Sequence, residues 1–512
     1  MAENGRIDWT SLWKKEDWVA VWIGFIIILA ILVGLKISTP KFKWTTETEF
    51  ASFAKEATVL VEKLVKQAGD AGEAALQEQA TALKGTLTAG DRKAIGAAAK
   101  KMEEACKGVK NEGLKKKGTQ VSKDISGEAG NLAAKVFSVD NVLYAIYIGV
   151  AFLILSIVAM LLMGEKAFQF IVGFPFVFLI AWAAQFIAGN YTVLYYGVEY
   201  VLWCLFLGLL VSNTVGVPNW LMHAVRTEFY IKTGLVILGT GMLFTEIVQA
   251  GAYGIVQAIL VVLAVWYLTF WVAKKLDVDD EFAAILSSAV SICGVSAAIA
   301  TSGAVQGDPK KLSYTTSIVL ICAVPMLIFQ PLISKAVGIP DVVAGAWLGG
   351  TLDTSGSVVA AGALISDTAM KTGVIVKMSQ NVLIGFAAFI LAVVWSFKGK
   401  MGPGVEKPGF LDIWFRFPKF VLGYLIASVV FSFLISPSTV AATKGMLGSL
   451  RTWWFALAFT SIGLETRFKD LASLGGGRPA LAFLIGQTFN IFWTLLLAYL
   501  IFGGYIFPAP KL

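Results

Sequence analysis

The chain has 512 residues, of which 57% are hydrophobic and 15% are charged, and its formal net charge is +8. Soluble domains carry about 25% charged residues, so this composition excludes an ordinary soluble protein and indicates a membrane protein. The positive charge is spread among loops, which favours anchoring and orientation over nucleic-acid binding.

Residues that could hold a metal ion or build a disulfide framework are scarce. The four cysteines, Cys106, Cys204, Cys293 and Cys322, show no metal-ligand spacing, and His223 is the single histidine. The sequence has no Walker A motif and no Gly-x-Ser-x-Gly elbow. We therefore expect no enzyme, no ATP-driven pump, no metal and no cofactor.

The N-terminal region has two parts of different composition. Residues 18–35 are apolar and follow Lys14 and Lys15 without a clear cleavage site after them, so residues 1–40 are expected to hold a cytoplasmic N-terminus and a signal-anchor helix. Residues 41–138 are rich in Ala, Lys, Glu and Gly and poor in aromatics. They predict an extracytoplasmic helical insert, such as a hairpin, with little core of its own.

Residues 139–512 form an almost continuous series of apolar runs and predict a transporter membrane domain. We expect an all-α polytopic membrane protein with about 11–13 membrane segments, some of them re-entrant or broken. The expected segments lie near 142–164, 167–188, 195–215, 229–249, 251–273, 281–303, 314–338, 341–365, 371–397, 412–435, 449–464 and 479–502.

Loop lysines and arginines predict the orientation, because they accumulate on the cytoplasmic side. With the N-terminus inside the bacterial inner membrane and strict alternation, the outside loops carry mainly Lys310, Lys311, Lys371 and Lys444. The inside loops carry Lys166, Arg226, Lys274, Lys275, Lys335, Lys398, Lys400, Lys407, Arg467, Lys469 and Arg478.

Two segments, residues 291–303 and 349–362, are dense in Gly, Ser, Thr and Ala. Small residues allow close helix packing, which is one interpretation. The other is a pair of broken helices, because glycine permits unwinding and a hydroxyl can cap a new helix start. The freed N–H groups and the positive helix end would then bind an anion.

Weak internal similarities favour an inverted-repeat transporter core, although chance similarity of small-residue helices explains them equally well. Residues 293–298 parallel residues 355–360. Residues 241–246, with a glycine near 251, parallel residues 463–466, which are followed by glycines at 475–477.

Ionisable residues within apolar runs are costly and therefore point to function. Asp353 lies inside the second Gly/Ser segment, and Lys377 lies within the next apolar run. Lys232, Glu199 and Glu246 lie nearer the expected membrane interfaces, where long side chains reach water easily.

The chain resembles the YeiH-like sulfate exporter family of membrane transporters from about Tyr195 to its end. The motifs that carry the resemblance are Ser-Ile-Cys-Gly-Val-Ser-Ala-Ala from residue 291 and Trp-Leu-Gly-Gly-Thr-Leu-Asp-Thr-Ser-Gly-Ser-Val-Val-Ala-Ala-Gly from residue 347. The resemblance implies a small-anion exporter with two broken helices that cross at the substrate site.

The sequence departs from the family pattern at this expected site. Asp353 stands where family members have a histidine, and Gln380 stands where they have an arginine. Both changes reduce the local positive charge, so the identity of the anion stays open.

These observations favour a secondary transporter, with export as the expected direction, for sulfate or another small sulfur-containing anion. Alternatives are a proton- or sodium-coupled carrier of organic anions, and a sensor or assembly protein that uses the insert. Expected partners are the anion, membrane lipid, a coupling proton or sodium ion and a second copy of the chain in a homo-oligomer, but no nucleic acid. The predicted coupling-ion residue is Asp353, and the predicted substrate-binding residues are Cys293, Gly294, Ser296, Thr354, Ser355, Gly356, Ser357 and Lys377.

Overall fold

The computed structural model describes residues 10–196, 198–398, 411–467 and 477–510. Within these residues the regular structure is helical, apart from isolated bridges that join Trp44 to Asn190 and Thr45 to Leu132. The expected all-α fold is therefore confirmed. Lys400, Lys407, Lys469 and the glycines at 475–476, which the orientation and repeat arguments used, lie outside the described residues.

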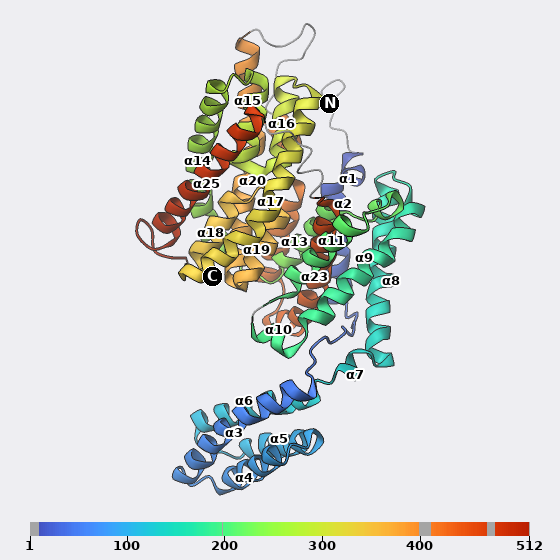
Figure 1. Ribbon diagram of the computed structural model, residues 1–512, viewed down its shortest axis with the longest axis vertical. Helices are drawn as coiled ribbons and strands as arrows, with labels where there is room; N and C mark the ends of the chain where they lie inside the picture. The colour runs from blue at the N-terminus through green and yellow to red at the C-terminus, as the bar shows by residue number, and fades with distance from the viewer. Residues whose placement is uncertain (1–9, 197, 399–410, 468–476, 511–512) are drawn as a thin grey trace. The chain divides into compact units, whose positions relative to one another are not determined.

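The chain divides into two compact units (Figure 1). Unit 1 contains residues 1–37, 150–181 and 201–512, and unit 2 contains residues 38–149 and 182–200. Two helices, α8 (Val139–Leu162) and α9 (Ala167–Ala188), each contribute residues to both units.

Unit 2 contains a four-helix bundle with a core of its own, made by α3 (Glu47–Asp70), α4 (Ala74–Ala89), α5 (Arg92–Cys106) and α6 (Glu112–Gly130). The expectation of a hairpin with little core was wrong. Small apolar residues recur at intervals of three and four, which aligns them on one helix face. The buried face of α3, for example, consists of Phe50, Ala54, Ala57, Val61, Leu64 and Ala68.

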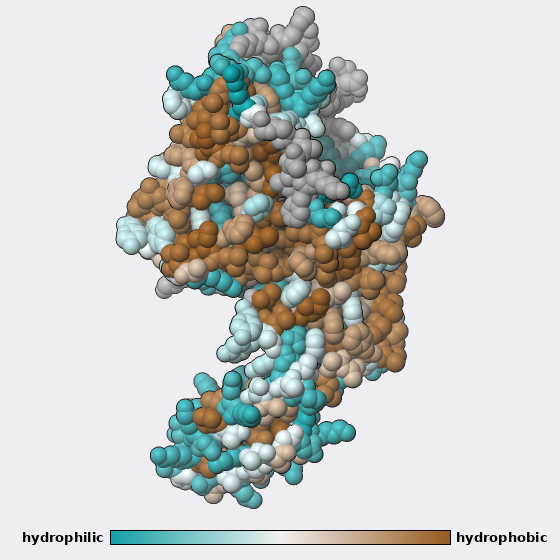
Figure 2. Space-filling model, viewed as in Figure 1, coloured by the Kyte–Doolittle hydropathy of each residue, from teal (hydrophilic) through white to brown (hydrophobic). Residues whose placement is uncertain are grey.

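Local capping fixes where the bundle helices begin. The Thr46 hydroxyl accepts from the Glu49 N–H, and the Glu49 carboxylate accepts from the Thr46 N–H, which together form a capping box. Asp91 caps α5 and Asn111 caps α6 through their side-chain oxygens. Charged residues cover the outer faces, so the bundle surface is hydrophilic in Figure 2.

Unit 1 is built from long apolar helices, and Figure 2 shows a hydrophobic surface over much of it. Among the described residues, seven helical stretches of the chain are long and apolar enough to cross a membrane. Apart from the helices of the two Gly/Ser segments, the longer helices that lie wholly or almost wholly in unit 1 are α2 (Glu16–Leu32), α11 (Tyr200–Thr214), α13 (Thr227–Gly239), α14 (Phe244–Lys275), α17 (Pro309–Val337), α20 (Asp367–Phe397), α22 with η3 (Lys419–Leu434), α23 (Pro437–Glu465) and α25 (Arg478–Phe502).

One expected boundary was wrong. The sequence predicts a break near residue 250, but α13 ends at Gly239 and α14 begins at Phe244. The short connection satisfies its own backbone, because Thr240 N donates to Ile237 O and Gly241 N donates to Leu238 O. The glycine at 251 lies inside α14, and a Cβ atom there would make only an ordinary contact, at 3.8 Å, with Ile375 of α20.

The two Gly/Ser segments are broken helices, and each folds into a hairpin. The first hairpin consists of α15 (Asp280–Ser288), η2 (Ala289–Cys293) and α16 (Gly294–Val305). Its two ends meet, because Asp308 N donates to Glu281 at 2.5 Å and Lys311 pairs with Asp279 at 2.9 Å. The expected segment 281–303 therefore does not cross unit 1 but returns to the side on which it began.

The second hairpin consists of α18 (Asp341–Thr351) and α19 (Ser355–Ile365). Gly345 near its start and Gly362 near its end both lie against the backbone at the beginning of α20, around Ala369 and Met370. A side chain at either glycine would collide with this backbone, so glycine permits the close packing. The expected segment 341–365 is therefore also re-entrant.

The hairpins enter unit 1 from opposite sides. The first begins where α14 ends and the second begins where α17 ends, and α17 starts beside the ends of the first hairpin. Because neither hairpin crosses unit 1, the predicted alternation now places Lys310 and Lys311 on the side that holds the N-terminus, and Lys335 on the opposite side. The change strengthens the bias of basic loops towards the side that holds the N-terminus.

Candidate functional site

The tips of the two hairpins meet inside unit 1. Gly294 begins α16 with φ +33°, and a Cβ atom there would lie 3.0 Å from the Cβ of Asp353 and 2.5 Å from Val319 Cγ1. Asp353 lies in the break between α18 and α19 and is 2% exposed. Glycine is needed at position 294 for both its backbone conformation and its lack of a side chain.

Polar side chains of α20 bind the carbonyl groups that the break of the first hairpin leaves free. Lys377 Nζ donates to Ile292 O at 2.6 Å, and Gln380 Nε2 donates to Ser291 O at 2.8 Å. Lys377 also donates to Gln380 Oε1 at 2.9 Å, which orients the amide. The negative end of this half-helix is therefore compensated within the protein.

Buried amide side chains also bind the carbonyl groups at the end of α18 in the second hairpin. Gln487 of α25 donates from Nε2 to Thr351 O at 3.0 Å, and Gln380 Nε2 also donates to Gly350 O at 3.3 Å. The carbonyl ends of both half-helices thus face buried amides and an ammonium group rather than open space.

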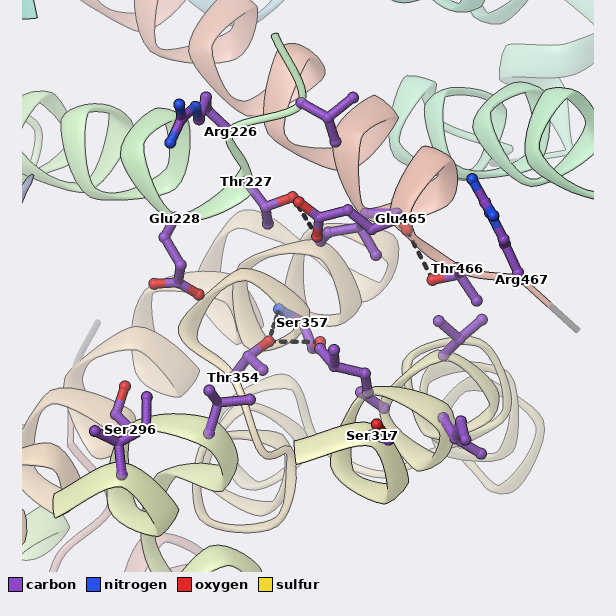
Figure 3. A pocket seen from close by; sticks show the side chains of 18 of the residues that line it. Arg226, Thr227, Glu228, Ser296, Ser317, Thr354, Ser357, Glu465, Thr466 and Arg467 are labelled. Atoms are coloured by element: carbon purple, nitrogen blue, oxygen red, sulfur yellow. Dashed lines mark hydrogen bonds between the residues drawn. The ribbon is translucent and has the colours of Figure 1, made fainter. Parts of the chain in front are cut away.

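The amino ends of α16 and α19, in contrast, face a cavity of about 720 Å³ (Figure 3). Ser296 of α16 and Thr354 and Ser357 of α19 line this cavity. The Thr354 hydroxyl accepts from Ser357 N at 3.0 Å and caps α19, as the dashed lines in Figure 3 show. Gly294 N donates to Ala289 O, and no side chain in the described part of the chain caps α16, so the N–H groups that follow Gly294 have no side-chain acceptor.

A second, smaller cavity of about 290 Å³ adjoins the first and shares Ser296, Thr354 and Lys232 with it. Asp353 and Asn381 also line it. Asp353 Oδ2 and Asn381 Oδ1 are shielded from solvent and have no hydrogen-bond partner among the described residues. Two unpartnered oxygens at one cavity wall suit a bound proton or cation, because a buried acceptor without a donor is costly.

Charged side chains close the cavities on the side where α13 begins. Lys232 of α13 pairs with Glu16 at 2.7 Å, with Asp17 at 2.8 Å and with Glu228 at 3.6 Å. Thr227 donates to Glu465 at 3.0 Å, and Figure 3 shows this pair at the cavity wall. The start of α13 therefore meets the end of α23, which makes these two helices antiparallel.

The structure brings most of the predicted site residues together at the hairpin tips. Ser296, Thr354 and Ser357 line the first cavity, whereas Cys293, Ser296, Asp353, Thr354 and Ser355 line the second. Gly294 and Gly356 are buried and provide close packing instead, Gly294 against Asp353 and Gly356 near Ile231.

Lys377 lies elsewhere. It is 2% exposed, and it lines neither cavity but binds Ile292 O behind the tip of the first hairpin. Its charge therefore acts on the carbonyl end of η2 rather than on the cavity directly.

Sequence reasoning missed the charged wall of the cavities. Lys232 was read as an interfacial side chain, and Glu16, Asp17, Glu228, Glu465 and Asn381 were not singled out for the site. The available signal was the placement of Glu16 and Asp17 immediately before an apolar run, and of Glu228 four residues before Lys232 on one helix face.

The helices and the site define a class. This is a multi-pass α-helical membrane protein in which two opposed re-entrant hairpins meet beside a polar cavity. No solved structure matches the chain.

Sequence comparison gives the family. The family described as Conserved hypothetical protein 698 matches residues 172–482. A UPF0324 membrane protein of Rhodopirellula baltica is 36% identical over 507 residues, covering 96% of this chain and 91% of the relative. Two UPF0324 membrane proteins of Nitratidesulfovibrio vulgaris are 34% and 41% identical over 566 and 358 residues, covering 98% and 67% of this chain and 97% and 62% of the relatives. The chain belongs to this family of membrane proteins, whose names state no substrate.

Proposed function

We propose that the protein is a secondary transporter of a small anion such as sulfate or a related sulfur oxyanion. One observation carries this proposal: the amino ends of two half-helices line one cavity while their carbonyl ends are bound by Lys377, Gln380 and Gln487. Each amino end is equivalent to about half a positive charge. The protein thus presents the electropositive ends of both breaks to a ligand.

The charges that line the cavities support coupling to a proton or a cation. The first cavity has three basic residues (Arg226, Lys232 and Arg467) and three acidic ones (Glu16, Glu228 and Glu465). The second has Lys232 against Asp17, Glu228 and Asp353. A dianion beside these carboxylates requires a proton or sodium ion on Asp353, so the anion and the coupling ion bind together.

A second candidate function is the transport of a larger organic anion by the same coupling. The first cavity favours it, because about 720 Å³ falls within the range of about 300–1,000 Å³ that binds organic ligands. Competition between sulfate and organic sulfonates for uptake separates the two candidates.

We also propose that the N-terminus lies in the cytoplasm of a bacterium, with the protein in the inner membrane. Basic residues collect on the side that holds the start of α2, which is the cytoplasmic pattern. Both cavities then face the cytoplasm, and residues 41–138 lie outside.

Sulfate uptake into proteoliposomes tests the transporter proposal. Thr354→Val removes the cap of α19 at the cavity, whereas Ser366→Ala removes the comparable cap of α20, where Ser366 accepts from Ala369 N at 3.0 Å away from both cavities. Loss of either cap costs about 1 kcal/mol of stability, but only Thr354→Val is expected to lower uptake. Absence of uptake by the folded wild type, or an equal loss in both variants, would contradict the proposal and favour the sensor alternative.

A further inference from the structure

A small basic cavity lies at the opposite end of α13 from the site described above. Its volume is about 130 Å³, and it is lined by Thr240 and Gly241 after α13, by Asp367 and Lys371 in the first turns of α20, and by Lys444 and Arg451 of α23. Because α13 begins at the charged wall of the large cavities and ends here, this cavity lies on the other side of unit 1.

The charges around this cavity do not balance. Three basic side chains face one carboxylate, and Asp367 already pairs with Lys371 at 2.7 Å. Lys444 and Arg451 have no ion-pair partner among the described residues. The Nε of Arg451 is shielded from solvent and has no hydrogen-bond partner there either. A shielded guanidinium N–H without an acceptor is costly, so an anion in this cavity would supply the acceptor that the described residues do not.

A structural role for Arg451 at the carbonyl end of α13 does not explain this arrangement. Arginine commonly binds the last carbonyls of a helix, but Ile237 O and Leu238 O already accept from Thr240 N and Gly241 N. The amino end of α20, in contrast, adds positive potential to the same cavity.

We infer that the cavity bounded by Lys371, Lys444 and Arg451 is a second anion site that takes a small inorganic oxyanion. A guanidinium group matches the two oxygens of an oxyanion in a forked geometry. The volume exceeds the about 30 Å³ of a liquid water molecule but is well below the about 300 Å³ of sites for organic ligands. Binding here does not require transport, but a role as the second station of the transport path rests on the proposed function.

Equilibrium binding of inorganic sulfate to the purified full-length chain tests this inference. Lys444 is exposed, so Lys444→Gln is expected to leave the fold intact. Arg451→Lys keeps the positive charge but removes the forked pair of guanidinium donors. Lys335→Gln, an exposed lysine at the end of α17 on the same side, is the matched control.

We expect two classes of sulfate site in the wild type and in Lys335→Gln. Lys444→Gln and Arg451→Lys should each weaken one class about tenfold or more and leave the other unchanged. Thr354→Val should show the reverse pattern, because it alters only the hairpin site. If the Lys444 and Arg451 variants bind sulfate as the control does, the second anion site is wrong. If only Thr354→Val weakens sulfate binding, the proposed function stands and the second anion site is rejected. Binding only at sulfate concentrations far above those that saturate the hairpin site would reveal an adventitious ion only and would also overturn it.

Discussion

Gly294 and Asp353 lie against each other at the tips of two hairpins that enter from opposite sides, and this contact joins the halves of the site. Space for a Cβ on Gly294 is absent, because Val319 Cγ1 would be 2.5 Å away. The contact leaves the amino ends of α16 and α19 beside the same cavity.

Gly294→Ala is expected to destabilise the protein by about 1–3 kcal/mol, because the new methyl group overpacks the tip and the residue keeps a positive φ. Thermal unfolding in detergent measures the effect. Gly445→Ala in α23 is the control, since a Cβ there meets open space, and alanine favours a helix by about 1 kcal/mol over glycine. Equal melting temperatures for the two variants would contradict the crowded tip.

Asp353→Asn is expected to abolish the pH dependence of anion uptake. An ionised Asp353 opposes a nearby anion, so wild-type uptake should rise as the pH falls and Asp353 takes up a proton. Asparagine stays neutral, so the variant should keep one rate across the range. Asp341→Asn, at the exposed start of the second hairpin, should keep the wild-type profile. An unchanged profile in Asp353→Asn would remove this residue from the coupling.

Lys377→Met is expected to destabilise the protein by about 1–3 kcal/mol, because Ile292 O loses its buried donor. The exposed Lys335→Met should have almost no effect. Calorimetry with sulfate and a monoanion then separates two roles for Lys377. Since it does not line the cavities, the variant should weaken both anions alike; a loss restricted to the dianion would show that Lys377 is a direct ligand.

Cys106 is expected to resist an impermeant thiol reagent in intact spheroplasts and after lysis, because it is 1% exposed in the core of unit 2 and burial raises the pKa of its thiol. Labelling of Cys106 in the folded protein would contradict the bundle. The exposed Thr88→Cys position reports the topology instead. Its labelling in intact spheroplasts would support an insert outside the cytoplasm, and labelling only after lysis would place the insert inside.

The sequence by itself determined the class of this protein and the two breaks. Apolar runs of about 20 residues and scarce charges are direct requirements of a hydrocarbon environment. The stretches around Gly294 and Gly356 are too rich in small polar residues for lipid-facing helices, which located the half-helix starts. The repeating Leu and Ala positions of unit 2 also form its core. The many small alanine side chains led to the wrong prediction that this region has little core of its own.

Tertiary structure alone decided which side each segment faces and which charges meet. A hairpin and a spanning helix have the same local pattern, because hydropathy does not state whether a broken helix reverses at its break. Only long-range contacts, such as Lys311 with Asp279, show the reversal. Similarly, Lys232 meets Glu16 and Asp17 across about 215 residues of chain. Lys377 lines neither cavity, and its ammonium group donates instead to Ile292 O at the break of the first hairpin.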